Sequence, residues 1–203
     1  KLGEKDAFWA VLSHRDKVGG KWKDKGFYKT GKFEIESILK RLRKEKIKVN
    51  FGEALDFGCG VGRLTQPLAK RFKRTYGVYI SNSMIKRAKV FNKYPRTCEY
   101  MINKKPNLSV FEDNKFDLIY TNIVLQHMPR EYSLRYLKEF HRVLRPGGVL
   151  IFQLPSKRKS LFQGFYTTIV PRVVLNYLNR ISRPHGLIIE MHPIKKNKII
   201  SYL

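Results

Sequence analysis

Three glycines at alternate positions, Gly58, Gly60 and Gly62, follow an acidic residue, Asp56, at the end of a short apolar run. Glycine lets a backbone turn tightly and approach a ligand closely, and the turn between a strand and a helix is where an open α/β sheet binds nucleotides. A dinucleotide fingerprint would need its third glycine at position 63, which is Arg63. The spacing therefore favours a nucleotide ligand without a pyrophosphate, and Asp56 could pair with an ammonium group on it.

The segments around this loop alternate between short apolar runs and amphipathic stretches. This alternation predicts an α/β fold, a doubly wound and mostly parallel sheet with helices on both faces. The expected strands are 54–57, 75–79, 98–102, 116–120 and 149–154. The expected helices are 5–13, 32–46, 63–72, 82–92 with Ser81 as its N-cap, and 130–144, which Pro146-Gly147-Gly148 should end.

Four segments resemble, in the same order, the motifs of class I S-adenosylmethionine (SAM)-dependent methyltransferases. Residues 54–69, ALDFGCGVGRLTQPLA, resemble motif I of that family. The other three segments are GVYISNSMIKRAK (77–89), FDLIYTNIVLQHMP (116–129) and EFHRVLRPGGVLIFQLPS (139–156). The resemblance covers about residues 50–156. It implies a Rossmann-like fold, methyltransferase activity, SAM as the cofactor and S-adenosylhomocysteine as the product.

The resemblance also implies which residues hold the cofactor. Asp56 and the three glycines, Gly58, Gly60 and Gly62, would hold the methionine part of SAM, and Met84 would pack near the adenine. SAM carries an ammonium group and a sulfonium, so an acidic side chain suits it at this point. The alternative for Met84 is a plain core methionine.

Two positions depart from the family pattern, and a third lies at the reaction cleft. Most members have an acid at the end of the second strand that accepts hydrogen bonds from the ribose, whereas Tyr79 stands here and brings no charge. Many members carry an Asp after the third strand that reads the adenine amino group, and Asn103 could do so through its side-chain carbonyl. The backbone after Tyr120, which includes Asn122, is implied to line the cleft where the methyl group is transferred.

His127 is the candidate catalytic base. It follows the fourth expected strand at the rim of the cleft, and an imidazole titrates near neutral pH. The alternative is that His127 hydrogen-bonds a loop or caps the next helix. Cys59, Cys98 and scattered histidines give neither metal-ligand spacing nor a disulfide framework, so no metal and a reduced, cytoplasmic setting are expected. No apolar run reaches the roughly 18–20 residues that a membrane span needs.

The sequence predicts two further parts around this core. Residues 1–49 would form a helical cover or lid, 50–156 the SAM-binding core, and 157–203 a helical segment on the acceptor side. The sheet of the family has seven strands, the last two forming an antiparallel hairpin. Since only five strands are recognised, this hairpin is expected to be missing, with the chain truncated after Leu203.

The charge of the chain leaves three functions open. Lys and Arg number 42 against 16 Asp and Glu, which gives a formal net charge of +26. Such a field attracts RNA or anionic lipid, but the basic residues are spread along the whole chain. We predict methyl transfer to an oxygen or nitrogen of a small molecule or glycan. The alternatives are an RNA methyltransferase, and a non-catalytic SAM-fold module that binds a partner or an anionic membrane.

Overall fold

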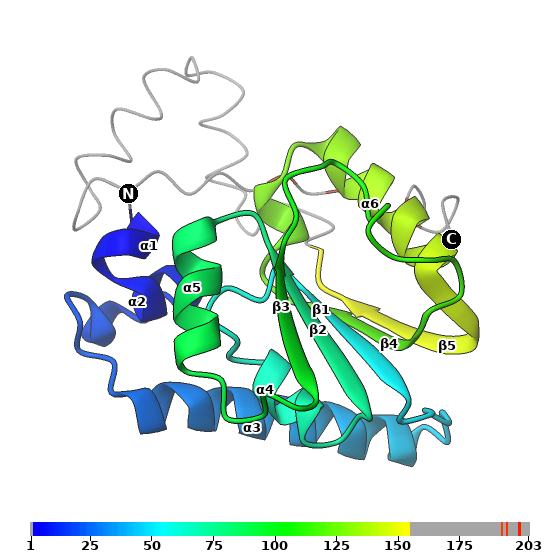
Figure 1. Ribbon diagram of the computed structural model, residues 1–203, viewed down its shortest axis with the longest axis horizontal. Coiled ribbons are helices and arrows are strands. Elements are labelled where there is room, and N and C mark those ends of the chain that lie inside the picture. Colours follow the sequence, from blue (N-terminus) through cyan, green and yellow to red (C-terminus); the bar gives the residue numbers. More distant parts are fainter. Residues whose placement is uncertain (1, 155–191, 193, 195–198, 200–203) are drawn as a thin grey trace, which may run out of the picture. The chain divides into compact units, whose positions relative to one another are not determined.

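The computed structural model describes residues 2–154 together with 192, 194 and 199. A five-stranded sheet has the order β3-β2-β1-β4-β5, and every pair of neighbouring strands is parallel (Figure 1). The strands are β1 (Glu53–Phe57), β2 (Arg74–Tyr79), β3 (Cys98–Ile102), β4 (Phe116–Thr121) and β5 (Leu144–Phe152). This confirms the predicted α/β class. The order also reverses at β1, because β2 and β4 flank it on opposite sides, and ligands bind at such a switch point.

The chain divides into two compact units. The first comprises residues 1–122 and 139–152 and holds the whole sheet. The second comprises residues 123–138 and 153–203. Most of the segment 157–203, predicted to lie on the acceptor side, is outside the described residues, and so is the part of the chain after which the hairpin was expected to be missing.

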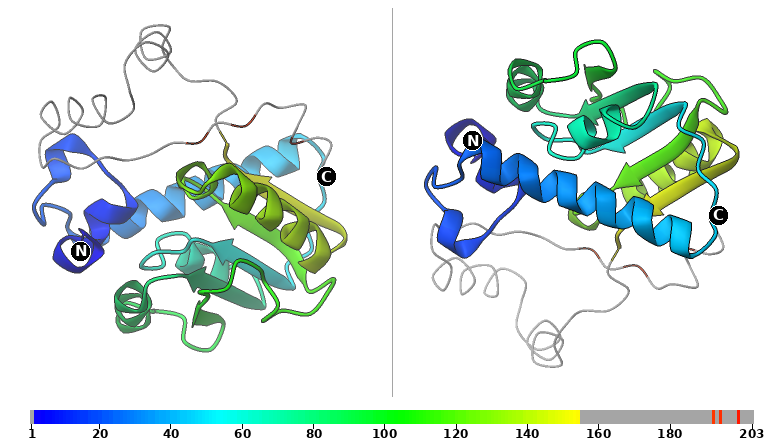
Figure 2. Two further views of the ribbon diagram at one scale, coloured as in Figure 1. Left: turned by 90° about the horizontal axis from the view of Figure 1, so that it is seen from above. Right: turned by 90° about the horizontal axis from the view of Figure 1, so that it is seen from below.

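Helices α3, α4 and α5 cover one face of the sheet. Their bounds are Asp24–Lys44 for α3, Thr65–Ala69 for α4 and Asn82–Val90 for α5. Ile35, Leu39 and Leu42 of α3 pack with Ala54 of β1 and Leu118 of β4, and Figure 2 shows α3 running across this face. α5 packs on β3 on the same face, where both cysteines lie in one buried cluster.

Aromatic residues fill the other face, together with the end of α6 (Arg130–Val143). Phe57 of β1 meets Phe140 of α6 with ring centroids 5.0 Å apart. The ring centroid of Tyr76 in β2 lies 5.4 Å from that of Phe111 and 5.8 Å from that of Phe116. Helices therefore lie on both faces, as the alternation of segments predicted.

The first helices differ from their predicted bounds because of specific contacts. In place of one helix over 5–13, α1 (Leu2–Lys5) and α2 (Ala7–Val11) are separated at Asp6, whose carboxylate caps α2 by accepting a 3.1 Å bond from the Trp9 N–H. α3 begins at Asp24 and not at residue 32. It includes Gly31, where a Cβ would overlap the backbone carbonyl of Arg63, so glycine permits the helix to approach closely.

Two smaller differences concern α4 and α5. The expected helix 63–72 is the shorter α4, which ends at Ala69 and is followed by a turn in which the Arg71 N–H donates to the Leu68 carbonyl at 2.7 Å. Ser81 takes the N-cap position of α5, but its hydroxyl does not cap the helix. That hydroxyl lies 3.0 Å from the hydroxyl of Ser83 instead.

β5 begins earlier than predicted and contains a bulge. Leu144 pairs with Phe116 of β4, and the next pair joins Val149 to Leu118. The intervening Pro146-Gly147-Gly148, which was expected to end the preceding helix, lies inside this bulge. Gly147 has a φ of +75°, a conformation that a glycine adopts without strain.

Candidate cofactor-binding site

The loop between β1 and α4 lies at the switch point of the sheet and turns on its three glycines. Gly58, Gly60 and Gly62 have φ angles of +83°, +56° and +84°, which residues with a side chain rarely adopt. The N–H groups of Gly58 and Cys59 donate to the carbonyl of Val78 in β2 at 2.9 and 3.1 Å. The alternate spacing of the glycines therefore builds the tight turn that the sequence predicted, anchored to the neighbouring strand.

The space around this loop leaves no room for larger residues. A Cβ on Gly60 would lie 2.5 Å from a methyl carbon of Val11 in α2. A Cβ on Gly62 would overlap the hydroxyl of Tyr100 in β3. Nothing in the sequence pattern indicated the contact with Val11, which joins two segments far apart in the chain.

Asp56 is buried near the end of β1, with 2% of its surface exposed. The Thr65 hydroxyl donates to its Oδ2 at 2.6 Å. Burial raises the pKa of Asp56 to about 7, and the Thr65 hydrogen bond and the positive charge of Arg63 oppose this effect only in part. A cation placed beside Asp56 would stabilise its ionised form. The carboxyl is therefore suited to a ligand that carries an ammonium group.

A carboxylate from α3 reaches the end of β4, which the sequence pattern did not reveal. Glu34 accepts hydrogen bonds from the Tyr120 hydroxyl at 2.6 Å and from the Asn122 amide at 2.7 Å. Its other oxygen lies 2.8 Å from Arg63, whose side chain is 5% exposed. Asn122, predicted to line the cleft, is thus held in place by Glu34. The sequence held one signal for this contact. Glu34 lies next to the buried face of α3, and a partly buried carboxylate needs a charged or hydrogen-bonding partner.

The N-terminal helices pack on the residues expected around the adenine. Met84 is 2% exposed and lies in an apolar cluster with Ala7 and Val61, to which Tyr79 also packs. A Cβ on Gly3 would lie 2.9 Å from the sulfur of Met84. Burial raises the pKa of the Tyr79 phenol. The N-terminal segment therefore covers Met84 within the same compact unit as the sheet.

Several proteins similar to this chain are named as methyltransferases. The chain is 34% identical over 98 residues to a 2-methyl-6-phytyl-1,4-hydroquinone methyltransferase from Synechocystis and 35% identical over 115 residues to a demethylmenaquinone methyltransferase from Staphylococcus saprophyticus. It is also 32% identical over 106 residues to a trans-aconitate 2-methyltransferase from Deinococcus radiodurans. These matches cover 48%, 55% and 52% of this chain but 30%, 48% and 39% of the relatives. The chain thus spans less than half the length of these relatives.

Solved structures and a family model agree with this fold. A protein from Pyrococcus horikoshii gives a TM-score of 0.63 at 22% identity, over 96% of this chain and 86% of that one. Magnesium protoporphyrin IX methyltransferase from Synechocystis, with bound S-adenosylhomocysteine, gives 0.57 at 20% identity, over 96% and 80%. Residues 55–152 match the family model described as a methyltransferase domain. This chain contains a class I SAM-dependent methyltransferase domain.

SAM is the cofactor of this family, and the residues of the methyltransferase domain fit it. The buried carboxyl of Asp56 suits an ammonium group, and the glycine loop has little side-chain bulk at the switch point. Met84 and Val61 are apolar residues beside this loop, of the kind that packs against a base, and the N-terminal helices cover them. Tyr79 gives the ribose no carboxylate, which is one of the two departures from the family pattern at this site, with Asn103 the other.

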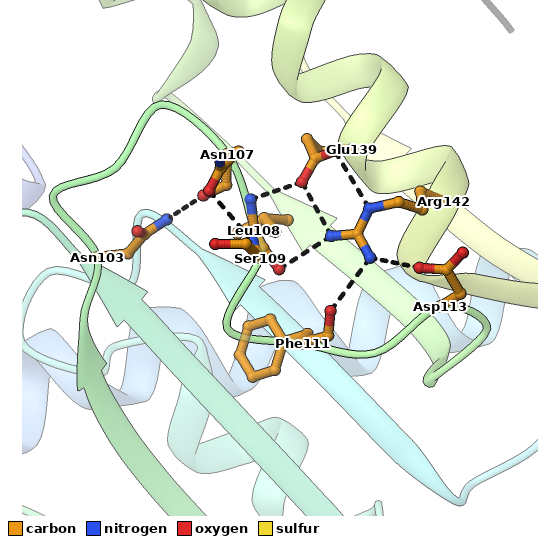
Figure 3. Close-up of polar contacts among 8 residues, drawn as sticks. All are labelled: Asn103, Asn107, Leu108, Ser109, Phe111, Asp113, Glu139 and Arg142. Carbon is orange, nitrogen blue, oxygen red and sulfur yellow. Dashed lines mark hydrogen bonds and ion pairs between the residues drawn. The ribbon is translucent and has the colours of Figure 1, made fainter.

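Asn103, after β3, is held within its own loop (Figure 3). Its Nδ2 donates to the Asn107 carbonyl at 2.8 Å, and its Oδ1 accepts a bond of 3.2 Å from the Lys105 N–H. The oxygen expected to read the adenine amino group therefore already has one partner, although such an oxygen can accept two hydrogen bonds. The cofactor role of Asn103 stays a prediction.

Arg142 of α6 holds the rest of this loop against α6 (Figure 3). It donates to the carbonyls of Leu108 and Phe111 at 3.0 and 3.1 Å, and it pairs with Asp113 at 2.6 Å and Glu139 at 2.9 Å. Glu139 in turn accepts a 2.7 Å bond from the Leu108 N–H. The hydrogen bond with Arg142 lowers the pKa of Glu139. This arginine of the fourth motif thus positions the loop that connects β3 to β4.

His127, the predicted base, belongs to the second unit and ends the 3-10 turn Leu125–His127. Its ring is exposed, with Nε2 3.3 Å from the side-chain nitrogen of Gln126. Ser133 fixes the turn by donating to the Leu125 carbonyl at 2.8 Å, and the His192 N–H donates to the Gln126 carbonyl at 2.8 Å. The catalytic role of His127 stays a prediction, because these contacts belong to a separate unit.

Two further features were searched for in the described part of the chain. No group of three or more His, Cys, Asp or Glu side chains there could hold a metal ion. Cys59 and Cys98 are both buried and free. Within the same described residues, no helix has the length and apolar character needed to cross a membrane.

Proposed function

We propose that this chain is a methyltransferase that transfers the methyl group of SAM to a small organic acceptor. The observation that carries the proposal is the buried carboxyl of Asp56 beside three left-handed glycines at the switch point of a parallel sheet. A site for a dinucleotide would need a glycine at position 63. Arg63 stands there instead, paired with Glu34.

In this proposal the first unit binds the cofactor through side chains of different chemical kinds. Asp56 pairs with the ammonium group of the methionine part of SAM, and the backbone of the glycine loop lies along that methionine part. Met84 packs near the adenine, and Tyr79 accepts one hydrogen bond from the ribose. Asn122, which Glu34 holds in place, lines the cleft on the side of β4. The side-chain carbonyl of Asn103 accepts a hydrogen bond from the adenine amino group.

SAM supplies a methyl group that its sulfonium makes electrophilic. The contribution of the protein is to orient the reactants and to exclude water, which can lower the barrier by several kcal/mol. Because α2 packs on Gly60 and the N-terminal helices cover Met84, this segment acts as the lid of the site and opens to admit the cofactor. His127 accepts the proton that an oxygen or nitrogen acceptor loses.

The relatives support a small acceptor. Their names describe methyl transfer involving a phytyl hydroquinone, demethylmenaquinone and trans-aconitate. This favours a small molecule over RNA, although the net charge of +26 had suggested RNA as an alternative. None of these three relatives is named for a glycan, so a sugar hydroxyl has no support beyond the sequence resemblance. The acceptor atom, oxygen or nitrogen, is part of the proposal.

The proposal is tested by calorimetric titration of the chain with SAM and with S-adenosylhomocysteine. Asp56→Asn should weaken binding at least about tenfold, because it removes a charge that faces an ammonium group. The matched control is Glu112→Gln, which neutralises an exposed carboxylate outside the site and should change the affinity less than about twofold. A folded wild-type chain that binds neither ligand would support the non-catalytic module instead.

A second variant separates catalysis from cofactor binding. With any acceptor that supports turnover, His127→Gln should lower kcat by about 10²–10⁴ if the imidazole is the base. The dissociation constant of SAM should stay the same, since His127 is not proposed to touch the cofactor. An unchanged kcat would assign His127 to loop structure.

A further inference from the structure

A groove lies on the face of the sheet that α3, α4 and α5 cover, outside the proposed cofactor site. It runs between α3 and α4 and reaches the segment that follows α5, and its volume is about 270 Å³. Ile35 and Gln66, both buried, line its floor. Gln66 is fixed there because its side-chain amide donates to the Phe91 carbonyl at 2.9 Å. The groove is thus a defined depression with an anchored base.

Positive charge is concentrated in this groove. Six of the eleven lining residues are exposed, and five of these six are basic. The five cations and the single acid are Lys29, Lys32, Lys70, Arg71, Lys93 and Glu36. A depression lined by one sign of charge focuses its field on an oppositely charged ligand.

Most of these cations have no partner among the residues that the structure describes. Lys32 lies 3.9 Å from Glu36, at an exposed position where such a pair contributes little. Lys29, Lys70, Arg71 and Lys93 make no ion pair with any described residue. The net charge of +4 on the lining residues is therefore not compensated by the part of the chain that the structure describes.

We propose that this groove is a binding site for a phosphate-bearing anion with several negative charges. Lysine and arginine both bind phosphate, and arginine can do so with two parallel hydrogen bonds. At about 270 Å³ the groove is slightly smaller than ordinary ligand pockets, which measure about 300–1,000 Å³, so it suits a compact oligophosphate or a single lipid head group. Phe33, which follows Lys32 and is 72% exposed, would contact lipid if the phosphate belongs to a membrane.

The site does not depend on the proposed methyl transfer, so its test uses no SAM. The first probe is sodium tripolyphosphate, titrated calorimetrically at a constant ionic strength of about 0.15 M, where long-range attraction is screened. The second probe is cosedimentation with phosphatidylcholine vesicles, with and without phosphatidic acid. The two probes distinguish a soluble phosphate from a lipid head group.

Two triple variants with the same change in charge locate the binding. The groove variant is Lys70→Gln, Arg71→Gln and Lys93→Gln. The control is Lys40→Gln, Arg43→Gln and Lys44→Gln, at exposed positions of α3 that do not line the groove. Circular dichroism and thermal unfolding without ligand establish that both variants fold.

The groove variant should bind the probe at least about tenfold more weakly than wild type, and the control within about twofold. Loss of tripolyphosphate binding identifies a soluble oligophosphate as the ligand class, and loss of vesicle binding alone identifies a lipid head group. The proposal is overturned if both triple variants weaken binding equally, because attraction would then be non-specific. It is also overturned if wild type binds neither probe.

Discussion

The hydroxyl of Thr65, the first residue of α4, donates a 2.6 Å hydrogen bond to the buried carboxyl of Asp56 in β1. This bond joins the two ends of the glycine loop, so the strand and the helix that flank the loop share one polar contact. Since a hydrogen bond to a charged group contributes about 1.5–3 kcal/mol, its strength depends on whether Asp56 is ionised. The protonation state of Asp56 therefore connects loop geometry, stability and ligand binding.

The free energy of unfolding should depend on pH through Asp56. Its pKa is about 7 in the folded protein against an ordinary value of 3.8, so between these pH values the folded state binds more protons than the unfolded state. Stability then falls as the pH rises from about 4 to about 7 and is independent of this group above that range. Urea unfolding at several pH values should show this slope in wild type and not in Asp56→Asn. Parallel curves for the two proteins would contradict the assignment.

SAM affinity should rise over the same pH range. An ammonium group favours ionised Asp56, so binding releases a proton wherever the carboxyl is protonated in the free protein. Titrations from pH 5.5 to pH 7.0, in two buffers with different ionisation enthalpies, would measure both the affinity and the released proton. Asp56→Asn should show neither. Affinity that does not change with pH in wild type would place the ammonium group elsewhere.

Glu34→Gln should destabilise the protein by about 3 kcal/mol, because it leaves a buried guanidinium without its carboxylate. The Arg63 side chain is only 5% exposed, whereas that of Glu34 is 24% exposed, which places the expected effect at the lower end of values for buried pairs. Urea unfolding measures this loss. The control is Glu36→Gln on the same helix, at an exposed position, which should cost less than about 0.5 kcal/mol. Equal effects would mean that the pair contributes no more than a surface contact.

Gly60→Ala should be destabilising for two separable reasons. A left-handed φ of +56° costs a residue with a side chain about 1–2 kcal/mol, and overlap with Val11 adds about 1–3 kcal/mol. In a Val11→Ala background only the first cost should persist. A double-mutant cycle by thermal unfolding should therefore give a coupling of about 1 kcal/mol or more. Additive effects would show that α2 does not press on the loop.

Arg142→Lys should loosen the loop between β3 and β4, because an ammonium group cannot reproduce the forked contacts of the guanidinium. Hydrogen exchange at Leu108, whose N–H donates to Glu139, should become about tenfold faster. The control is Arg135→Lys, an exposed position on the same helix, which should leave this exchange unchanged. Equal protection in both variants would show that Arg142 is not needed to order the loop.

Local sequence signals predicted the sheet and the glycine loop, because apolar runs and glycine spacing are properties of short segments. All five strands occur close to their expected positions. The contacts that were missed join residues far apart in the chain. The beginning of α3 depends on the approach of Gly31 to Arg63, and the bulge of β5 depends on its pairing with β4. Neither contact leaves a periodic pattern in one segment.

The same distinction between local signals and distant contacts applies to the residues of the site. The arrangement of Asp56 and the glycines follows from one contiguous motif, so the sequence was sufficient to place them. Glu34 acts on Asn122, 88 residues later, and no motif includes both. The cofactor roles of Tyr79 and Asn103 stay predictions, since they depend on a ligand that bonds to them.

The contact of Glu34 with Asn122 also has a consequence for how the chain folds. Each neighbouring pair in the described sheet is parallel, so each requires a crossover and not a local hairpin. Contacts between distant residues slow folding, because the intervening chain must close as a loop first. During synthesis on the ribosome, Glu34 and the glycine loop therefore emerge well before β4 and Asn122. A nascent chain should acquire cofactor affinity only after Asn122 has left the exit tunnel.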